Sequence, residues 1–335
     1  MKNQVNTDKY SIYNGDCLEL LPELPENSID LCIYSPPFAG LYIYSSDKRD
    51  MSNNESKEDF LKHYEFLIKE LSRVTKPGRI NAVHCTDVIT HTTKHNLWDF
   101  PHEIIKLYEK YGFTYNNRIT IWKEPLEVRM RTMVQSLTHK NIVEDSTRCF
   151  PALPDYILLF RKGGENKVPV THDNGLTNYP YFGEYPFLPM HEKQYGNWQH
   201  FYEKWKNFKG DPKENKLAHI IWQRYASSVW DDIRGNNTLD FKCAKEEDDE
   251  KHVHPLQLDV IDRLVELYSN PNEVVLTPFM GVGSEVYSPV SMGRKAIGIE
   301  LKDSYFKQAI LNLKEAEKRF KEVVKDASLF DAIKD

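Results

Sequence analysis

Apolar residues follow two repeating patterns along this chain. Continuous apolar runs predict buried strands at residues 29–34, 79–85, 119–122, 156–160, 273–276 and 296–300. Between several of these runs, apolar residues at helical spacing predict amphipathic helices, for example Phe60, Tyr64 and Leu67 before an expected stop at Pro77-Gly78. Strands that alternate with helices in this way predict an α/β fold, built on a doubly wound, mainly parallel sheet.

The middle of the chain departs from this alternation. From about residue 163 to Trp230 the sequence is rich in Pro, Gly, Asn and aromatic residues and shows no sustained period. Beyond it, a helical pattern with Leu258, Ile261 and Leu264 leads into the strand, glycine loop, helix and strand of a βαβ unit. We therefore expect residues 1–162 and 229–335 to form one domain, with residues 163–228 inserted into it.

The overall composition is ordinary for a soluble globular protein, with 40% hydrophobic and 28% charged residues among 335. No apolar run approaches the roughly 18 residues that span a bilayer, and the N-terminal residues contain no apolar signal-peptide core. The five cysteines are scattered without a Cys-x-x-Cys pair, which argues against a zinc cluster and a disulfide framework. These features predict a protein of the reducing cytoplasm with no metal site and no membrane partner.

The charge balance is a mild argument against a nucleic-acid partner. The formal net charge is −6, whereas phosphate binding requires clustered Lys and Arg. However, the acidic run from Glu246 to Glu250 supplies much of this balance by itself. A basic face can exist beside such an acidic segment, so nucleic acid is not excluded.

Two short loops carry the candidate chemistry. Ser35-Pro36-Pro37-Phe38 follows the strand at 29–34, and the loop from Pro278 to Gly283 follows the strand at 273–276. Open α/β sheets bind ligands at the carboxyl ends of their strands, so both loops are expected in one site. The glycines of the second loop let backbone N–H groups approach a ligand. The next strand ends in the acid Glu300, at the position where dinucleotide-binding folds place an acid that binds ribose hydroxyls. Taken singly, either loop also fits an ordinary tight turn.

On these two motifs and their order, the chain resembles the amino-methylating DNA methyltransferases. Members of this family transfer a methyl group from S-adenosylmethionine to an exocyclic nitrogen of a DNA base. Here the catalytic motif precedes the cofactor loop, which is similar to the circularly permuted β-class arrangement. The resemblance covers about residues 10–160 and 228–320 and implies a Rossmann-like fold, with target recognition in the inserted region 163–228.

The resemblance implies a role for each matched residue. Ser35, Pro36, Pro37 and Phe38 match the catalytic motif that holds the target amine. The matched cofactor-binding positions are Asp16, His254, Pro278, Phe279, Gly281, Gly283 and Glu300. In that set the family places Asp16 near the adenine, His254 near the methionine end and Glu300 at the ribose.

Three residues depart from the family pattern. Thr277 stands where the family usually has Asp, and Glu285 stands where a small hydroxyl residue is usual. Pro289 falls inside the predicted helix that follows the glycine loop, where it is expected to produce a kink. These departures imply weaker or altered cofactor binding.

The target implied by the resemblance is a base in double-stranded DNA, flipped out of the duplex before transfer. Family members whose catalytic motif begins with Ser more often methylate N4 of cytosine, whereas those whose motif begins with Asp more often methylate N6 of adenine. Because the motif here begins with Ser35, cytosine is favoured. Candidate DNA-binding residues are Arg129, Arg131, Lys140, Arg148, Lys204 and Lys206. A homodimer and a cognate restriction nuclease are further partners that the resemblance raises.

Two other functions remain open from the sequence. An amine methyltransferase that acts on RNA or on protein glutamine shares a related motif, although such enzymes usually place the cofactor loop first. A catalytically degenerate relative that only binds DNA is suggested by Thr277 and Pro289.

Overall fold

The computed structural model describes residues 3–37, 51, 56–89, 97–132, 138–148, 151–173, 175–176, 179, 198–241 and 255–332. The side chains of residues 131, 132, 148, 198, 199 and 320–332 lie outside this description. The chain divides into two compact units, one made of residues 1–168 with 231–335 and the other of residues 169–230.

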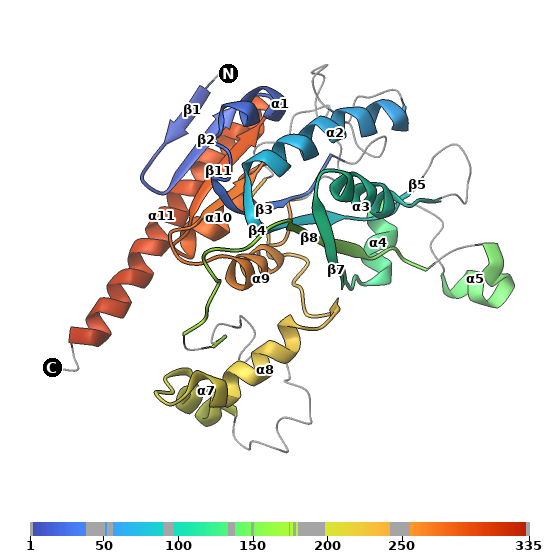
Figure 1. Cartoon of the computed structure of the whole chain (residues 1–335). Helices are drawn as coiled ribbons and strands as arrows, with labels where there is room; N and C mark the ends of the chain where they lie inside the picture. Colours follow the sequence, from blue (N-terminus) through green and yellow to red (C-terminus); the bar gives the residue numbers. More distant parts are fainter. Residues whose placement is uncertain are drawn as a thin grey trace. The chain divides into compact units, whose positions relative to one another are not determined.

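The larger unit is built on a mixed sheet whose middle is parallel (Figure 1). Its strands are β1 (Asn3–Asn6), β2 (Tyr10–Asn14), β3 (Ile29–Tyr34), β4 (Thr75–Cys85), β7 (Phe113–Ile121), β8 (Asp155–Lys162), β10 (Val274–Thr277) and β11 (Lys295–Glu300). They lie in the order β1-β2-β11-β10-β3-β4-β8-β7. The pairs from β2 to β4 are parallel, whereas β1 with β2, β4 with β8 and β8 with β7 are antiparallel. The predicted doubly wound, mainly parallel sheet is confirmed.

Helices cover both faces of this sheet (Figure 1). One layer contains α1 (Cys17–Leu20), α2 (Lys57–Val74) and α3 (Phe100–Lys110), and the other contains α9 (Leu258–Tyr268), α10 (Ser284–Ser291) and α11 (Asp303–Ala332). Shorter elements of the same unit are η1 (Leu21–Glu23), β5 (Val88–Ile89), β6 (Leu97–Trp98), α4 (Pro125–Thr132), α5 (His139–Glu144) and η3 (Ser146–Arg148). None of the helices in the described part of the chain is long and apolar enough to cross a bilayer.

The helix predicted between Ser56 and Pro77-Gly78 is α2. It begins at Ser56, whose hydroxyl accepts from the Asp59 amide, and it ends at Val74, shortly before Pro77. Thr75 already has extended backbone angles, and Pro77 and Gly78 lie within β4. β4 has extra residues here relative to β3, because Ile29 pairs with Thr75 whereas Leu31 pairs with Ile80. The strand bulges here because proline cannot donate to a sheet ladder.

The smaller unit contains more regular structure than the sequence pattern predicted. It includes α7 (Trp198–Lys206), η4 (Pro212–Glu214), α8 (Lys216–Tyr225) and β9 (Val229–Trp230). Asn215 caps α8 by accepting from the Leu217 and Ala218 amides, and Leu217, Ile221 and Tyr225 are buried on one face. The expectation of no sustained period was therefore wrong for these helices, whose short amphipathic patterns stand among turn residues.

Aromatic side chains of α2 and α3 pack over the carboxyl half of β3. The Tyr34 hydroxyl lies 2.7 Å from that of Tyr64 on α2 and 2.9 Å from that of Tyr108 on α3. All three rings are fully buried, so each hydroxyl is satisfied where an unpaired one would be costly. Since Tyr34 is the last residue of β3, this contact fixes the point at which the chain leaves the sheet.

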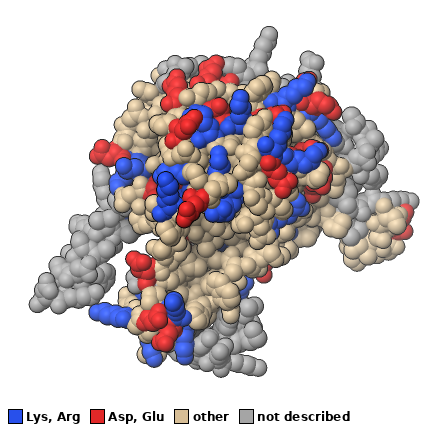
Figure 2. All heavy atoms as spheres, in the orientation of Figure 1, with Lys and Arg blue, Asp and Glu red and all other residues tan. Residues whose placement is uncertain are grey.

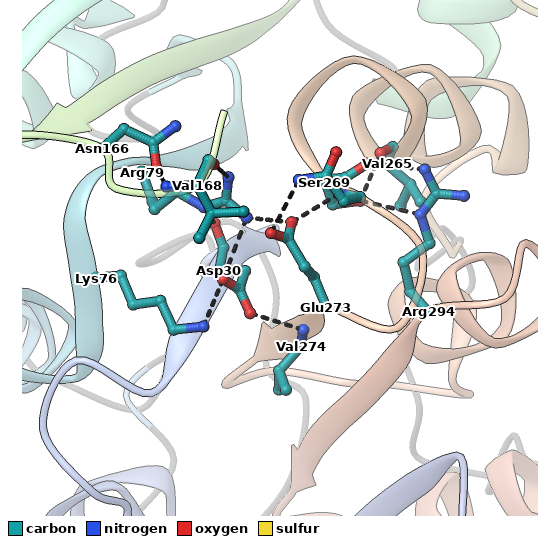
Figure 3. Close-up of polar contacts among 11 residues, drawn as sticks. Asp30, Lys76, Arg79, Asn166, Val168, Val265, Ser269, Glu273, Val274 and Arg294 are labelled. Atoms are coloured by element: carbon teal, nitrogen blue, oxygen red, sulfur yellow. Dashed lines mark hydrogen bonds and ion pairs between the residues drawn. The ribbon is translucent and has the colours of Figure 1, made fainter. Parts of the chain in front are cut away.

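Buried charges join the opposite end of the same strands (Figure 3). The Asp30 carboxylate on β3 accepts from the Val274 amide at 3.0 Å, from Lys76 Nζ at 2.6 Å and from Arg79 at 3.1 Å. Arg79 also pairs with Glu273, which immediately precedes β10. These contacts tie β3, β4 and β10 together and thereby set the register of the two strands that carry the candidate loops.

Candidate active site

The two candidate loops leave neighbouring parallel strands at the same edge of the sheet. Leu31 of β3 is paired with Val275 of β10, and Cys32 with Leu276. The loops that follow are therefore adjacent. The Tyr34 and Phe279 rings have centroids 5.8 Å apart, with planes tilted by 52°.

Both loops line one cavity of about 450 Å³ in the larger unit. Ser35, Pro36 and Pro37 contribute to it from the first loop, and Pro278, Phe279 and Gly281 from the second. Asp16 and Glu300 also line the cavity. The structure thus brings together, around a single space, most of the residues that the resemblance selected from distant parts of the sequence.

The glycine loop has backbone angles that require glycine. Gly281 has φ of +54° and Gly283 has φ of +99°, both in the region that L-residues rarely adopt. At Gly281 an added Cβ would meet no atom within 4 Å, because it would project into open space. At Gly283 it would come within 3.3 Å of the Ala309 Cβ. Gly281 therefore leaves space at the cavity wall, whereas Gly283 allows close packing of α10 against α11.

Glu300 holds this loop at the end of β11. Its Oε2 accepts from the Gly281 amide at 2.7 Å, and its Oε1 accepts from the Lys302 amide at 2.8 Å. Its carbonyl accepts from Gly15 N at 3.0 Å and from Asn14 Nδ2 at 3.0 Å, which joins β11 to the turn after β2. The carboxylate is thus fixed at the cavity wall by backbone donors from two sides.

Asp16 is the N-cap of α1. Its carboxylate accepts from the Leu18 amide at 2.9 Å, and its side chain lines the same cavity. Capping alone accounts for an aspartate at this position. Because Asp16 also lines the cavity, it can contact a ligand that is bound there.

A chain of polar contacts that the sequence pattern does not predict runs from Ser35 into the protein. Ser35 Oγ lies 2.9 Å from His84 Nδ1, and His84 Nε2 lies 2.9 Å from Asp155 Oδ2. Lys123 pairs with the same Asp155 oxygen. His84 lies near the end of β4, Asp155 starts β8 and Lys123 follows β7, so antiparallel pairing brings all three to one edge.

Two buried carboxyl groups near the cavity have shifted pKa values in opposite directions. Burial alone would raise the pKa of Asp155, but the charge of Lys123 and the contacts with His84 outweigh it and hold the pKa well below its usual range. Burial, with a further contribution from Glu300, raises the pKa of Glu285 to about 8. Glu285 therefore lines the cavity as a neutral acid at neutral pH, whereas Asp155 is ionised.

The other predicted site residues are either outside the described residues or exposed on the surface. Phe38 and His254 lie outside the described residues, as do the side chains of Arg131 and Arg148. The remaining basic candidates are exposed: Arg129 on α4, Lys140 on α5, and Lys204 and Lys206 on α7 of the smaller unit. Lys140 lies 3.7 Å from Glu144, and Lys204 and Lys206 lie over the rings of Trp205 and Tyr202.

Basic side chains do not form one continuous stripe on the face drawn in Figure 2, where Lys and Arg are interspersed with Asp and Glu. Interspersed charges of both signs are typical of a solvated surface. This face therefore does not by itself mark a nucleic-acid interface.

The family of the chain follows from comparison with known proteins. Residues 29–311 match the N6_N4_Mtase family model, described as DNA methylase. The chain belongs to this family. It is also 25% identical over 296 residues to the type II methyltransferase M.BglII of Bacillus subtilis and, over the same length, to M.BamHI of Bacillus amyloliquefaciens. These matches cover 88% of this chain but 66% and 55% of the two relatives, so the chain spans less than two thirds of their length.

The fold has counterparts among solved structures. TTHA0409 of Thermus thermophilus, in complex with S-adenosyl-L-methionine, is 20% identical, with a TM-score of 0.58. The match covers 92% of this chain and 95% of that one. At this identity the likeness concerns the fold, and it agrees with the Rossmann-like architecture described above.

Proposed function

We propose that this protein transfers a methyl group from S-adenosylmethionine to an exocyclic amine of a base in double-stranded DNA. One observation carries the proposal: the Ser35-Pro36-Pro37 motif and the Gly281 loop line the same cavity. A methyl donor and an acceptor amine bound there would be held close together, and positioning supplies much of the rate enhancement in such a transfer. Membership of the DNA methylase family supports the same reaction.

The residues around the cavity fit the methyl donor. The missing Cβ at Gly281 leaves a cradle in which a ligand can approach the backbone closely. We assign Pro278, Phe279, Gly281 and Gly283 to this loop, and Glu300 to the ribose hydroxyls. When bound, S-adenosylmethionine supplies an electrophilic methyl group on a sulfonium. Asp16 would contact the adenine end, and His254 is proposed for the methionine end on the resemblance alone.

Ser35, Pro36, Pro37 and Phe38 are proposed to hold the target base. An exocyclic amine is a poor nucleophile because its lone pair is delocalised into the ring. A hydrogen-bond acceptor facing the amine favours the pyramidal nitrogen that can attack. Two prolines fix φ and stiffen the loop that presents the Ser35 oxygen. Ser at the first position favours N4 of cytosine over N6 of adenine, and Phe38 would stack on the flipped base.

The inserted residues 163–228 are proposed to read the DNA sequence. Lys204 and Lys206 of α7 lie beside aromatic rings in this segment, a combination that suits phosphate contacts with base stacking. Arg129, Arg131, Lys140 and Arg148 would extend the phosphate contacts from the larger unit. A homodimer and a cognate restriction nuclease remain proposals that follow from the type II relatives, and so does a cytoplasmic location.

A methyl-transfer assay with a single substitution tests this function. We expect wild-type protein to transfer label from S-adenosylmethionine to duplex DNA carrying its recognition site. Ser35→Ala should reduce the rate by roughly 100-fold or more, because the amine loses its acceptor, while calorimetry shows unchanged cofactor affinity. Ser28→Ala is the matched control, since the Ser28 hydroxyl donates to the Pro25 carbonyl in an exposed turn.

The same assay separates the alternatives. Preferential labelling of RNA or of a protein glutamine would show that the substrate is RNA or protein instead of DNA. Absence of cofactor binding, with DNA binding retained, would instead identify a degenerate relative.

A further inference from the structure

The Ser35 hydroxyl has a hydrogen-bond partner within the protein, the ring of His84. His84 and Ser35 both line the cavity, and the side chain of His84 is only 11% exposed. Because Ser35 Oγ and His84 Nδ1 are 2.9 Å apart, the protonation of this ring nitrogen decides whether Ser35 donates or accepts on its cavity side. The direction of that hydrogen bond therefore bears on catalysis.

Asp155 determines which ring nitrogen of His84 carries a hydrogen. An ionised carboxylate only accepts hydrogen bonds, and Lys123 keeps Asp155 ionised through a buried ion pair. Nε2, 2.9 Å from Asp155, must then be the protonated nitrogen. In the neutral ring Nδ1 is bare and accepts from the Ser35 hydroxyl. The lone pairs of Ser35 Oγ are then free to accept a hydrogen bond from a group bound in the cavity.

We propose that His84 and Asp155 are positioning residues that fix Ser35 as a hydrogen-bond acceptor toward the target amine and that His84 receives the proton released by methylation. This proposal rests on the function proposed above. It also predicts a preference for an amino group, because an acceptor-only Ser35 would repel a base that presents a carbonyl oxygen at the same place.

The proton path balances. The amine nitrogen uses its lone pair to form the N–C bond as the C–S bond breaks, and its electron pair remains on sulfur. The nitrogen, now positively charged, gives one proton to Ser35 Oγ while the Ser35 hydroxyl proton moves to His84 Nδ1. The products are a neutral methylamine, a neutral serine and an imidazolium paired with Asp155. The imidazolium then returns the proton to water.

The charged groups around His84 support this path. Asp155 from β8 contacts His84, and Lys123 after β7 pairs with Asp155. Asp87, Glu124 and Glu127 line the same cavity. Arg118 of β7 lies 5.0 Å from the ring of Tyr156, the residue next to Asp155. The Asp155 carboxylate is therefore the ion-pair partner for an imidazolium formed at His84.

The substitutions His84→Asn and Asp155→Asn separate geometry from proton transfer. The Asn amide of H84N places a neutral acceptor near the former Nδ1, so it can bind the Ser35 hydroxyl but cannot take up a proton. The Asn of D155N can donate to Nε2, which favours the tautomer with a hydrogen on Nδ1 and reverses Ser35. His102→Asn is the matched control, because His102 is exposed on α3.

Nitrogen NMR of the full-length protein with labelled histidine, with the His84 signal identified by its loss in H84N, reads the tautomer without any turnover. We expect a neutral His84 with hydrogen on Nε2 in the wild type and a shift toward Nδ1–H in D155N. An Nδ1–H tautomer in the wild type would overturn the proposal. This measurement needs no methyl transfer, so it tests the roles of His84 and Asp155 separately from the proposed function. The proposed function itself fails only if the wild type methylates no DNA.

Single-turnover rates as a function of pH complete the test. The wild-type rate should rise with pH along the NMR titration of His84, because an imidazolium reverses the Ser35 hydrogen bond. H84N should lose this limb and be slower by roughly 100-fold, the lower range for general acid–base catalysis, with unchanged cofactor affinity. H102N should retain the wild-type profile. Retention of both rate and pH limb in H84N would contradict the proposal.

Discussion

The rings of Tyr34 and Phe279 lie 5.8 Å apart, at the points where β3 and β10 end and the two candidate loops begin. Residues from opposite ends of the sequence therefore meet through a direct side-chain contact. Tyr34 is held in turn by Tyr64 and Tyr108. The position of the catalytic loop thus depends on a buried aromatic cluster as well as on the sheet.

Tyr34→Phe should separate stability from chemistry. The variant keeps the ring beside Phe279 but leaves the buried hydroxyls of Tyr64 and Tyr108 without this partner, at a cost of about 1–3 kcal/mol. Urea denaturation should show this loss, whereas the methyl-transfer rate of the folded protein should be close to that of the wild type. A large loss of rate at unchanged stability would contradict this division of roles.

Gly281→Ala should reduce mainly cofactor affinity, whereas Gly283→Ala should reduce mainly stability. The Cβ of G281A would meet no protein atom within 4 Å, but it would occupy open space beside a residue that lines the cavity. Cofactor affinity should therefore fall while stability drops by only about 1–2 kcal/mol for the left-handed backbone. In G283A the less favourable φ and the contact with Ala309 should cost about 1–3 kcal/mol. Calorimetry and thermal unfolding together measure both. Equal effects on affinity and stability in the two variants would contradict the distinction.

Glu285 should make the protein less stable as pH rises. Its pKa is about 8 in the folded state and 4.5 in the reference state, because the charged form is disfavoured by burial. Between these pH values unfolding releases a proton, so raising the pH favours the unfolded state. Denaturation from pH 5 to 9 should show this decline in wild type, and Glu285→Gln should remove it. The exposed Glu109→Gln serves as control, and an unchanged slope in E285Q would refute the assignment.

Arg79 should be far more important for stability than Lys76, although both pair with Asp30. Arg79 is 3% exposed, and Arg79→Met leaves Asp30 and Glu273 as buried charges without their shared partner. A loss of about 3–5 kcal/mol is expected. The Lys76 side chain is 40% exposed, so Lys76→Met should cost about 0–1 kcal/mol. Similar losses of unfolding free energy for R79M and K76M in urea denaturation would contradict the idea that burial makes Arg79 more important than Lys76.

The sequence was sufficient to predict the parallel sheet and both loops, because each depends on a local pattern. An apolar run followed by Ser-Pro-Pro or by a glycine pair marks a strand and the turn after it. Parallel strands then carry such turns to one edge of the sheet. Glu300 follows from the same rule, since it ends a strand, whereas Asp16 was selected by the resemblance alone.

His84 and Asp155 could not be found in this way. Asp155 is the first residue of its strand, and it reaches the ligand edge only because β8 runs antiparallel to β4. Strand direction is not encoded in an apolar run, so the sequence alone did not connect Asp155 with Ser35. Helix α8 was missed for another reason: its ten residues carry a cap at Asn215 and a buried face, but stand in a turn-rich segment.

The central claim is that the chain methylates an exocyclic amine in DNA. The most direct measurement is mass spectrometry of nucleosides from duplex DNA incubated with the protein and S-adenosylmethionine carrying a deuterated methyl group. We predict a labelled amino-methylated nucleoside, with N4-methylcytosine favoured over N6-methyladenine. Label on a ring carbon such as C5 of cytosine, or label found only in RNA or protein, would contradict the account.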